Sequence, residues 1–173
     1  MKQPFILAPL ALFFALLTIP AQADRPGGKG RGKGGKGEMR GPLPAEQRAI
    51  IHELADNHKK LSRKVTLTPK GYEAVTTSDD ADLAAKLKTH FRYMEKRLDA
   101  GAMVRRWDPA YAELTEYYDK LEVKMEELPK GLKVTVTGKT AKAVKVARNH
   151  ASIVTSFVKK GSKELPKEHD AAN

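Results

Sequence analysis

The chain has no cysteine among its 173 residues. This absence excludes a disulfide, a thiol nucleophile, covalently attached c-type haem and lipid attachment through an N-terminal cysteine. Catalytic motifs are also missing, since there is no Gly-x-Ser-x-Gly and no glycine-rich phosphate loop after a predicted strand. No pair of carboxylates can be singled out for hydrolysis. The sequence therefore gives no case for an enzyme, and packing or a ligand must hold the fold together.

Long apolar runs are scarce, and only the first residues come close to one. Phe5 to Ile19 is mostly apolar, follows the positive start Met1-Lys2, and leads to the small-residue triplet Ala21-Gln22-Ala23. These are the parts of a secretory signal peptide. We predict a signal peptide over 1–23, cleaved after Ala23, a periplasmic or secreted mature protein, and no transmembrane segment in it.

The chain is rich in charged residues, and the positive ones outnumber the negative ones, which gives a net charge of +11. Residues 24–44 are rich in glycine and lysine and have almost no large apolar side chain, so we predict that they are disordered. Without aromatic side chains for base stacking, this tract gives no sign of a specific nucleic-acid partner. It is either a solubilising linker or a tether to an anionic surface or polymer of the cell envelope. The candidate polyanion-binding residues are Lys29, Arg31, Lys33, Lys36 and Arg40.

The rest of the chain contains one unit twice. Residues 51–101 align without a gap on residues 111–161, a shift of 60 positions, and the two copies share Pro-Lys-Gly, a central histidine and a final glycine. Such self-similarity fixes the architecture before other features do. We therefore predict a single domain over 45–161, built from two 60-residue repeats, followed by a frayed, polar tail over 162–173.

Periodicity within each repeat predicts helix, strand, helix. Apolar residues from Ala45 onward recur at helical spacing as far as Pro69. Tyr72 to Thr77 is rich in β-branched and aromatic residues, as a short strand would be. A second helix follows, and the same order recurs in the second copy. We expect an α+β fold, mainly helical, with four helices and a two-stranded antiparallel ribbon related by pseudo-symmetry.

Three histidines fall on predicted core-facing helical stripes. His90 and His150 occupy equivalent places in the two repeats, and His58 lies on the first stripe. Met94 is one turn beyond His90 and points the same way. Imidazole and thioether are ligands for copper and haem iron, and imidazole also suits zinc. These four residues are candidate ligands for a transition metal such as copper or zinc, or for non-covalent haem.

A structural role for the same histidines is the alternative. A core imidazole commonly donates to a carbonyl or a threonine hydroxyl, and the threonine-rich strands would supply such acceptors. In that case, each histidine only braces a helix against a strand. Imidazoles that converge on a cavity would favour a ligand, and imidazoles bonded to strand acceptors would favour bracing.

The chain resembles a family of small exported bacterial proteins that has no settled activity. The resemblance covers about residues 50–161 and rests on Asp56-Asn57-His58, Pro69-Lys70-Gly71, Thr76 to Asp80, His90, Met94, Gly101, Asp108-Pro109, Gly131, Thr137, His150-Ala151, Phe157-Val158 and Gly161. It implies one exported domain with a duplicated helix–strand–helix unit.

We expect a non-enzymatic periplasmic or secreted binding protein that holds a metal ion or haem through its core histidines. The alternative is a structural or interaction protein that contacts anionic polymers at the cell envelope. A sensor or chaperone for a partner protein is a third possibility.

Overall fold

The computed structural model describes residues 38–172. These residues belong to one compact unit. The predicted signal peptide over 1–23 and the larger part of the basic tract over 24–44 lie outside the described residues, so both stay predictions. None of the described helices is both long enough and apolar enough to cross a membrane.

Each repeat has two helices and two strands. The first has α1 (Ala45–Asp56), β1 (Leu61–Thr68), β2 (Gly71–Ser78) and α2 (Ala81–Asp99). The second has α3 (Pro109–Tyr117), β3 (Leu121–Leu128), β4 (Gly131–Gly138) and α4 (Ala141–Lys160). Short 3-10 turns precede the hairpins and flank the domain, namely η1 (Glu38–Arg40), η2 (His58–Lys60), η3 (Tyr118–Lys120) and η4 (Gly161–Lys163).

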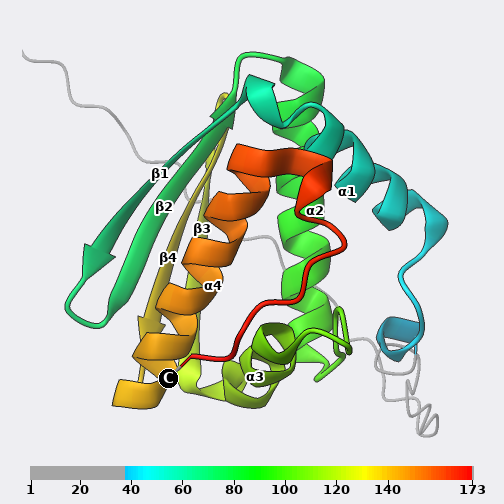
Figure 1. Ribbon diagram of the computed structural model, residues 1–173. Helices are drawn as coiled ribbons and strands as arrows, with labels where there is room; N and C mark the ends of the chain where they lie inside the picture. Colours follow the sequence, from blue (N-terminus) through cyan, green and yellow to red (C-terminus); the bar gives the residue numbers. More distant parts are fainter. Residues whose placement is uncertain (1–37, 173) are drawn as a thin grey trace, which may run out of the picture. The chain divides into compact units, whose positions relative to one another are not determined.

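The four strands form one antiparallel sheet in the order β1-β2-β4-β3. Helices α2 and α4 lie against the same face of this sheet, as Figure 1 shows. The buried side chains of β2 and β4 point to these helices, and the opposite face carries partly exposed residues such as Glu73, Thr77 and Thr135. One solvated face is common in antiparallel sheets.

The predicted two-stranded ribbon is wrong, because the sheet has four strands. The other two strands, β1 and β3, lie where the periodicity predicts the ends of the first and third helices. Helix α1 ends at Asp56, where the Asn57 side chain donates to the carbonyl of Glu53 at 3.0 Å. Leu61 and Val65 are four residues apart, a spacing that fits both a helical stripe and one face of a strand. Pro69 and Gly71 are predicted to end the helix, but Pro69-Lys70 is instead the two-residue turn of a hairpin, and Gly71 begins β2.

The centre of the sheet carries the pseudo-twofold relationship. Ala74 on β2 lies opposite Val134 on β4, and these two residues are equivalent in the repeat. The flanking bonds repeat the symmetry, since Ser78 N donates to Lys130 O and Gly138 N donates to Lys70 O, each at 2.8 Å. The axis therefore passes between Ala74 and Val134, and it relates α2 to α4.

The core lies between this face of the sheet and the two long helices. Helix α4 contributes small residues to it, Ala143, Ala147 and Ala151, which let the helix lie close to β2 and β4. Helix α2 contributes Leu87, Phe91 and Leu98, which are only partly buried. Consequently, the two halves share a topology, but α4 packs more closely against the sheet than α2 does.

Candidate functional site

His90 and His150 lie near the middle of α2 and α4. The two residues are equivalent in the repeat, as are Ala74 and Val134, which lie opposite one another where β2 and β4 pair. The His150 ring meets Tyr111 of α3 edge to face, with 5.6 Å between the ring centroids. Charges on His90, Arg63 and Asp108 all act on the pKa of His150, so the two histidines share one electrostatic environment.

Both imidazoles are held neutral. Burial lowers the pKa of His90 to about 4. Burial also lowers the pKa of His150 to about 4, with a further lowering from Arg63 and His90 and an opposing effect of Asp108. Desolvation disfavours the charged form of a base, which gives the direction of both shifts. Near neutral pH, each ring therefore keeps a free lone pair, the form that binds metals.

Nδ1 of His90 is enclosed and has no hydrogen-bond partner within the described residues. Burying a polar nitrogen without a partner costs on the order of 1–3 kcal/mol. The bracing alternative expects a hydrogen bond from His90 to a strand carbonyl or threonine, and within residues 38–172 Nδ1 of His90 makes none.

The other predicted ligands are placed differently. His58 lies in η2, and its Nδ1 is 3.0 Å from the carbonyl oxygen of Val158 near the end of α4, so this histidine does join two elements. Met94 is partly buried, one turn after His90 on α2. Across residues 38–172, no three His, Asp or Glu side chains are grouped so as to hold a metal ion.

Among the predicted polyanion-binding residues, only Arg40 is described. It lies exposed at the end of η1. Lys29, Arg31, Lys33 and Lys36 lie outside the described residues.

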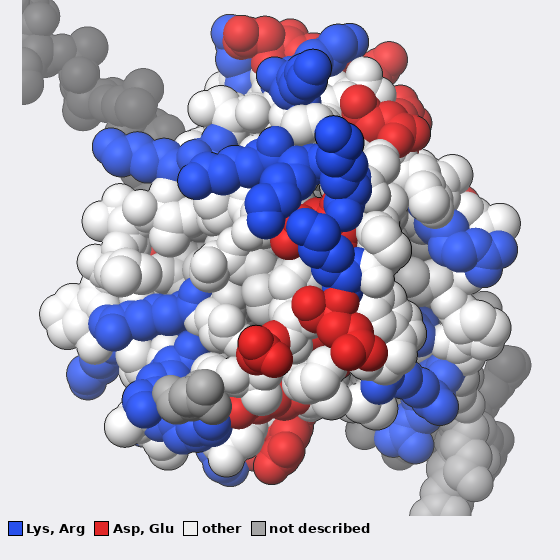
Figure 2. All heavy atoms as spheres, in the orientation of Figure 1, with Lys and Arg blue, Asp and Glu red and all other residues white. Residues whose placement is uncertain are grey.

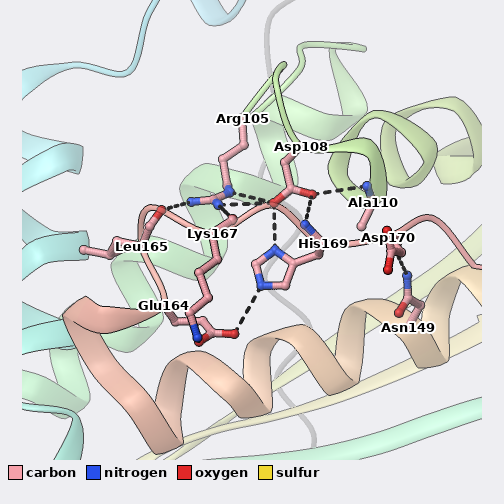
Figure 3. A network of polar contacts seen from close by, with 9 residues as sticks. All are labelled: Arg105, Asp108, Ala110, Asn149, Glu164, Leu165, Lys167, His169 and Asp170. Carbon is pink, nitrogen blue, oxygen red and sulfur yellow. Dashed lines mark hydrogen bonds and ion pairs between the residues drawn. The ribbon is translucent and has the colours of Figure 1, made fainter.

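A polar network that the sequence did not reveal holds the C-terminal segment (Figure 3). Asp108, fully buried, caps α3 by accepting from Ala110 N and faces Nδ1 of His169 at 2.8 Å. The other ring nitrogen of His169 lies 3.4 Å from Glu164, which is also buried. Both nitrogens of His169 are therefore engaged by carboxylates, and this histidine serves as a structural link.

Arg105 joins the linker between the repeats to the same segment. Its guanidinium donates to Asp108 and to the carbonyls of Leu165 and Lys167. The guanidinium also lies 4.2 Å from the centre of the Trp107 ring. Arg105 has a positive φ of 53°, an uncommon conformation that these contacts hold. We expected a frayed tail over 162–173, and the structure instead packs its described part against α3 and α4.

The hollows on the described surface include two of several hundred Å³. One, of about 630 Å³, lies between α4 and the C-terminal segment and includes Asn149, Ser156 and His169 in its lining. The other, of about 570 Å³, lies between the end of α2, α3 with η3, and β3. Neither hollow is lined by His90 or His150.

Comparisons of the chain with known protein families, curated proteins and solved structures found no match.

Proposed function

We propose that the protein is an exported, non-enzymatic binding protein, and that its ligand is a copper(I) ion held by His90 and His150. The observation that carries the proposal is the enclosed Nδ1 of His90, which has no partner in the described part of the chain. An equivalent histidine stands across the pseudo-twofold axis. A ligand between the two helices would then be bound by one imidazole from each half.

Copper(I) suits this environment better than zinc or haem. Zinc usually takes four protein ligands in a structural site and three in a catalytic one, and no group of three is found over residues 38–172. Haem needs a large cavity, and neither of the two hollows described above is lined by His90 or His150. A divalent ion without a carboxylate is costly to desolvate, whereas a soft monovalent ion is satisfied by neutral donors. Met94, one turn from His90, can add a thioether.

The test is an anaerobic copper(I) titration against a competing chelator. We expect the parent to bind one ion, and His90→Ala and His150→Ala to weaken binding strongly. His52→Ala is the matched control, because His52 is exposed on α1. At a free copper(I) concentration of 100 Kd, the parent should gain about 2.7 kcal/mol in its free energy of unfolding, and the double variant nothing.

The bracing alternative predicts a different result from the same variants. Each single change would then lower the free energy of unfolding by about 1–3 kcal/mol, with or without copper. A parent that takes up no copper(I) while the variants lose this much stability would refute the copper site.

A second candidate function is contact with an anionic surface or polymer of the envelope. It is favoured by the Lys and Arg side chains that gather over the C-terminal end of α4 and the segment after it, as Figure 2 shows. Lys159, Lys160 and Lys163 are exposed there. Binding to anionic vesicles should weaken steeply with added salt, because such attraction is screened over about 8 Å at physiological ionic strength. Replacing these three lysines with glutamine should reduce it.

A further inference from the structure

The hollow beside α2 has apolar walls and an acidic rim. Its walls include Leu98, Leu121 and Val123. Its rim carries four carboxylates, contributed by Glu95, Asp99, Glu116 and Asp119. An apolar wall next to clustered negative charge is complementary to a cation on an alkyl chain.

The pseudo-symmetry gives an internal comparison, because the equivalent place in the other half is filled. Gly161, which follows α4, lies so close to His58 that a β-carbon would come within 2.3 Å of its ring. Ser162 donates to Asp56 of α1. Gly101, the equivalent of Gly161, has nothing within 4 Å of such a β-carbon. The chain after α4 therefore closes one half, and the chain after α2 leaves the other half open.

The closed half also contains a guanidinium. Arg63 on β1 donates to Thr155 on α4 at 3.3 Å and to Thr76 on β2 at 2.7 Å. Its side chain thus fills the space between the edge of the sheet and the end of the long helix.

The open half has no residue equivalent to this arginine in chemistry, and a carboxylate replaces the threonine on the long helix that accepts from it. The equivalent of Arg63 is Val123, and the equivalent of Thr155 is Glu95, and both line the hollow. The equivalent of Thr76 is Val136, a buried apolar residue. The space that a guanidinium fills in the first half is therefore lined by a carboxylate and a valine in the second.

Three of the four carboxylates around this hollow are short of counter-charges, and the fourth, Asp119, pairs with Lys120 at 2.7 Å. Within residues 38–172, no ion pair is found for Glu95, Asp99 or Glu116, although the chain as a whole carries +11. Burial and the neighbouring Asp99 raise the pKa of Glu95. Burial, Asp99 and Glu95 together raise the pKa of the Tyr118 hydroxyl. A bound cation would relieve these unfavourable interactions.

We propose that this hollow binds an alkylguanidinium group, with its alkyl part against Leu98 and Val123 and its guanidinium against Glu95 and Asp99. The planar donor fork of a guanidinium matches a carboxylate, and its weak hydration favours a partly buried place. The group is either that of a small molecule or an arginine side chain, such as Arg25 or Arg31 of the basic tract. This site is independent of the histidine pair.

The test is calorimetric titration of the full mature chain with butylguanidinium, using neutral butylurea as the matched ligand. We expect heat of binding with butylguanidinium alone. Glu95→Thr, which installs the residue of the closed half, should weaken binding at least tenfold. Glu126→Gln, an exposed change outside the hollow, should leave it unchanged. Equal binding of butylurea, or unaltered affinity of Glu95→Thr, would overturn the proposal.

Val123→Arg rebuilds the closed half and provides a second variant. Its own guanidinium should fill the hollow, abolish binding of butylguanidinium and leave the melting temperature unchanged or higher. Undiminished binding by folded Val123→Arg would also overturn the proposal. If this variant does not fold, the Glu95→Thr comparison alone decides.

The source of the guanidinium is tested in the full chain. When every Lys and Arg of residues 24–41 is replaced with glutamine, affinity for butylguanidinium should rise several-fold if the tract occupies the hollow. Unchanged affinity assigns the hollow to an external alkylguanidinium. Whichever of these two results is found, Glu95→Thr must still weaken the binding of butylguanidinium.

Discussion

Gly71 on β2 lies so close to Val136 on β4 that a β-carbon at Gly71 would come within 1.9 Å of the Val136 carbonyl oxygen. The pseudo-twofold axis repeats this contact between Gly131 and Thr76, at 2.1 Å. Only glycine permits the two central strands to meet in this register. The Pro-Lys-Gly triplet that both repeats share thus ends in the residue that joins the two halves.

We expect Gly71→Ala to lower the free energy of unfolding by on the order of 3 kcal/mol or more, because a backbone carbonyl must move to admit the methyl group. Gly101→Ala is the control. That position has a φ of 64° but open space around it, so only the backbone strain of about 1–2 kcal/mol applies. Denaturant unfolding measures both. Equal losses would contradict the close contact.

The repeat was the most informative part of the sequence for this fold. It predicts that His90 and His150 are equivalent and that one strand from each half pairs with the other. It does not reveal the edge strands, because Leu61 and Val65 satisfy a helical and a strand period together. In the structure, the residues after Pro69-Lys70 return along β1 as a hairpin. From the sequence alone, this hairpin turn cannot be told apart from the end of a helix at the same proline.

The C-terminal segment was beyond prediction for a different reason. Its residues are mostly polar, and its order depends on Arg105 and Asp108, which lie some sixty residues earlier in the chain. Nothing local to Glu164 or His169 indicates these partners. The open hollow could not be predicted from the sequence either, since it arises from the different paths that the chain takes after Gly101 and Gly161.

Asp108 provides the test of this segment. Asp108→Ala removes a helix cap and leaves Arg105 and His169 without their buried partner. We expect a loss of about 3–5 kcal/mol in the free energy of unfolding, together with faster proteolysis of residues 164–172. Asp80→Ala is the matched control, because Asp80 caps α2 near the surface, and it should cost only about 1 kcal/mol. A comparable small loss for Asp108→Ala would show that the network contributes little.

The histidine pair predicts a stability that falls in mild acid. Each histidine has a pKa of about 4 in the folded protein and an ordinary value of 6.5. Between these values, the unfolded chain binds more protons, so stability is complete above about pH 6.5 and declines as pH falls to about 4. Each histidine should contribute a slope of about 1.4 kcal/mol per pH unit.

Urea unfolding at pH 7.5 and 5.5 measures this loss. His90→Gln and His150→Gln should each reduce it by about 1.4 kcal/mol, since glutamine does not titrate. His52→Gln, on the exposed side of α1, should leave it unchanged. If the two core variants lose as much stability in acid as the parent does, the histidines are not held neutral by burial.

The most direct test of the proposed copper site is X-ray absorption spectroscopy of residues 24–173 loaded with one equivalent of copper(I). We expect scattering from two imidazole rings in the parent, one ring in His90→Ala or His150→Ala, and an unchanged spectrum in His52→Ala. A spectrum without imidazole scattering, or one that stays the same when both His90 and His150 are replaced, would contradict the proposed site.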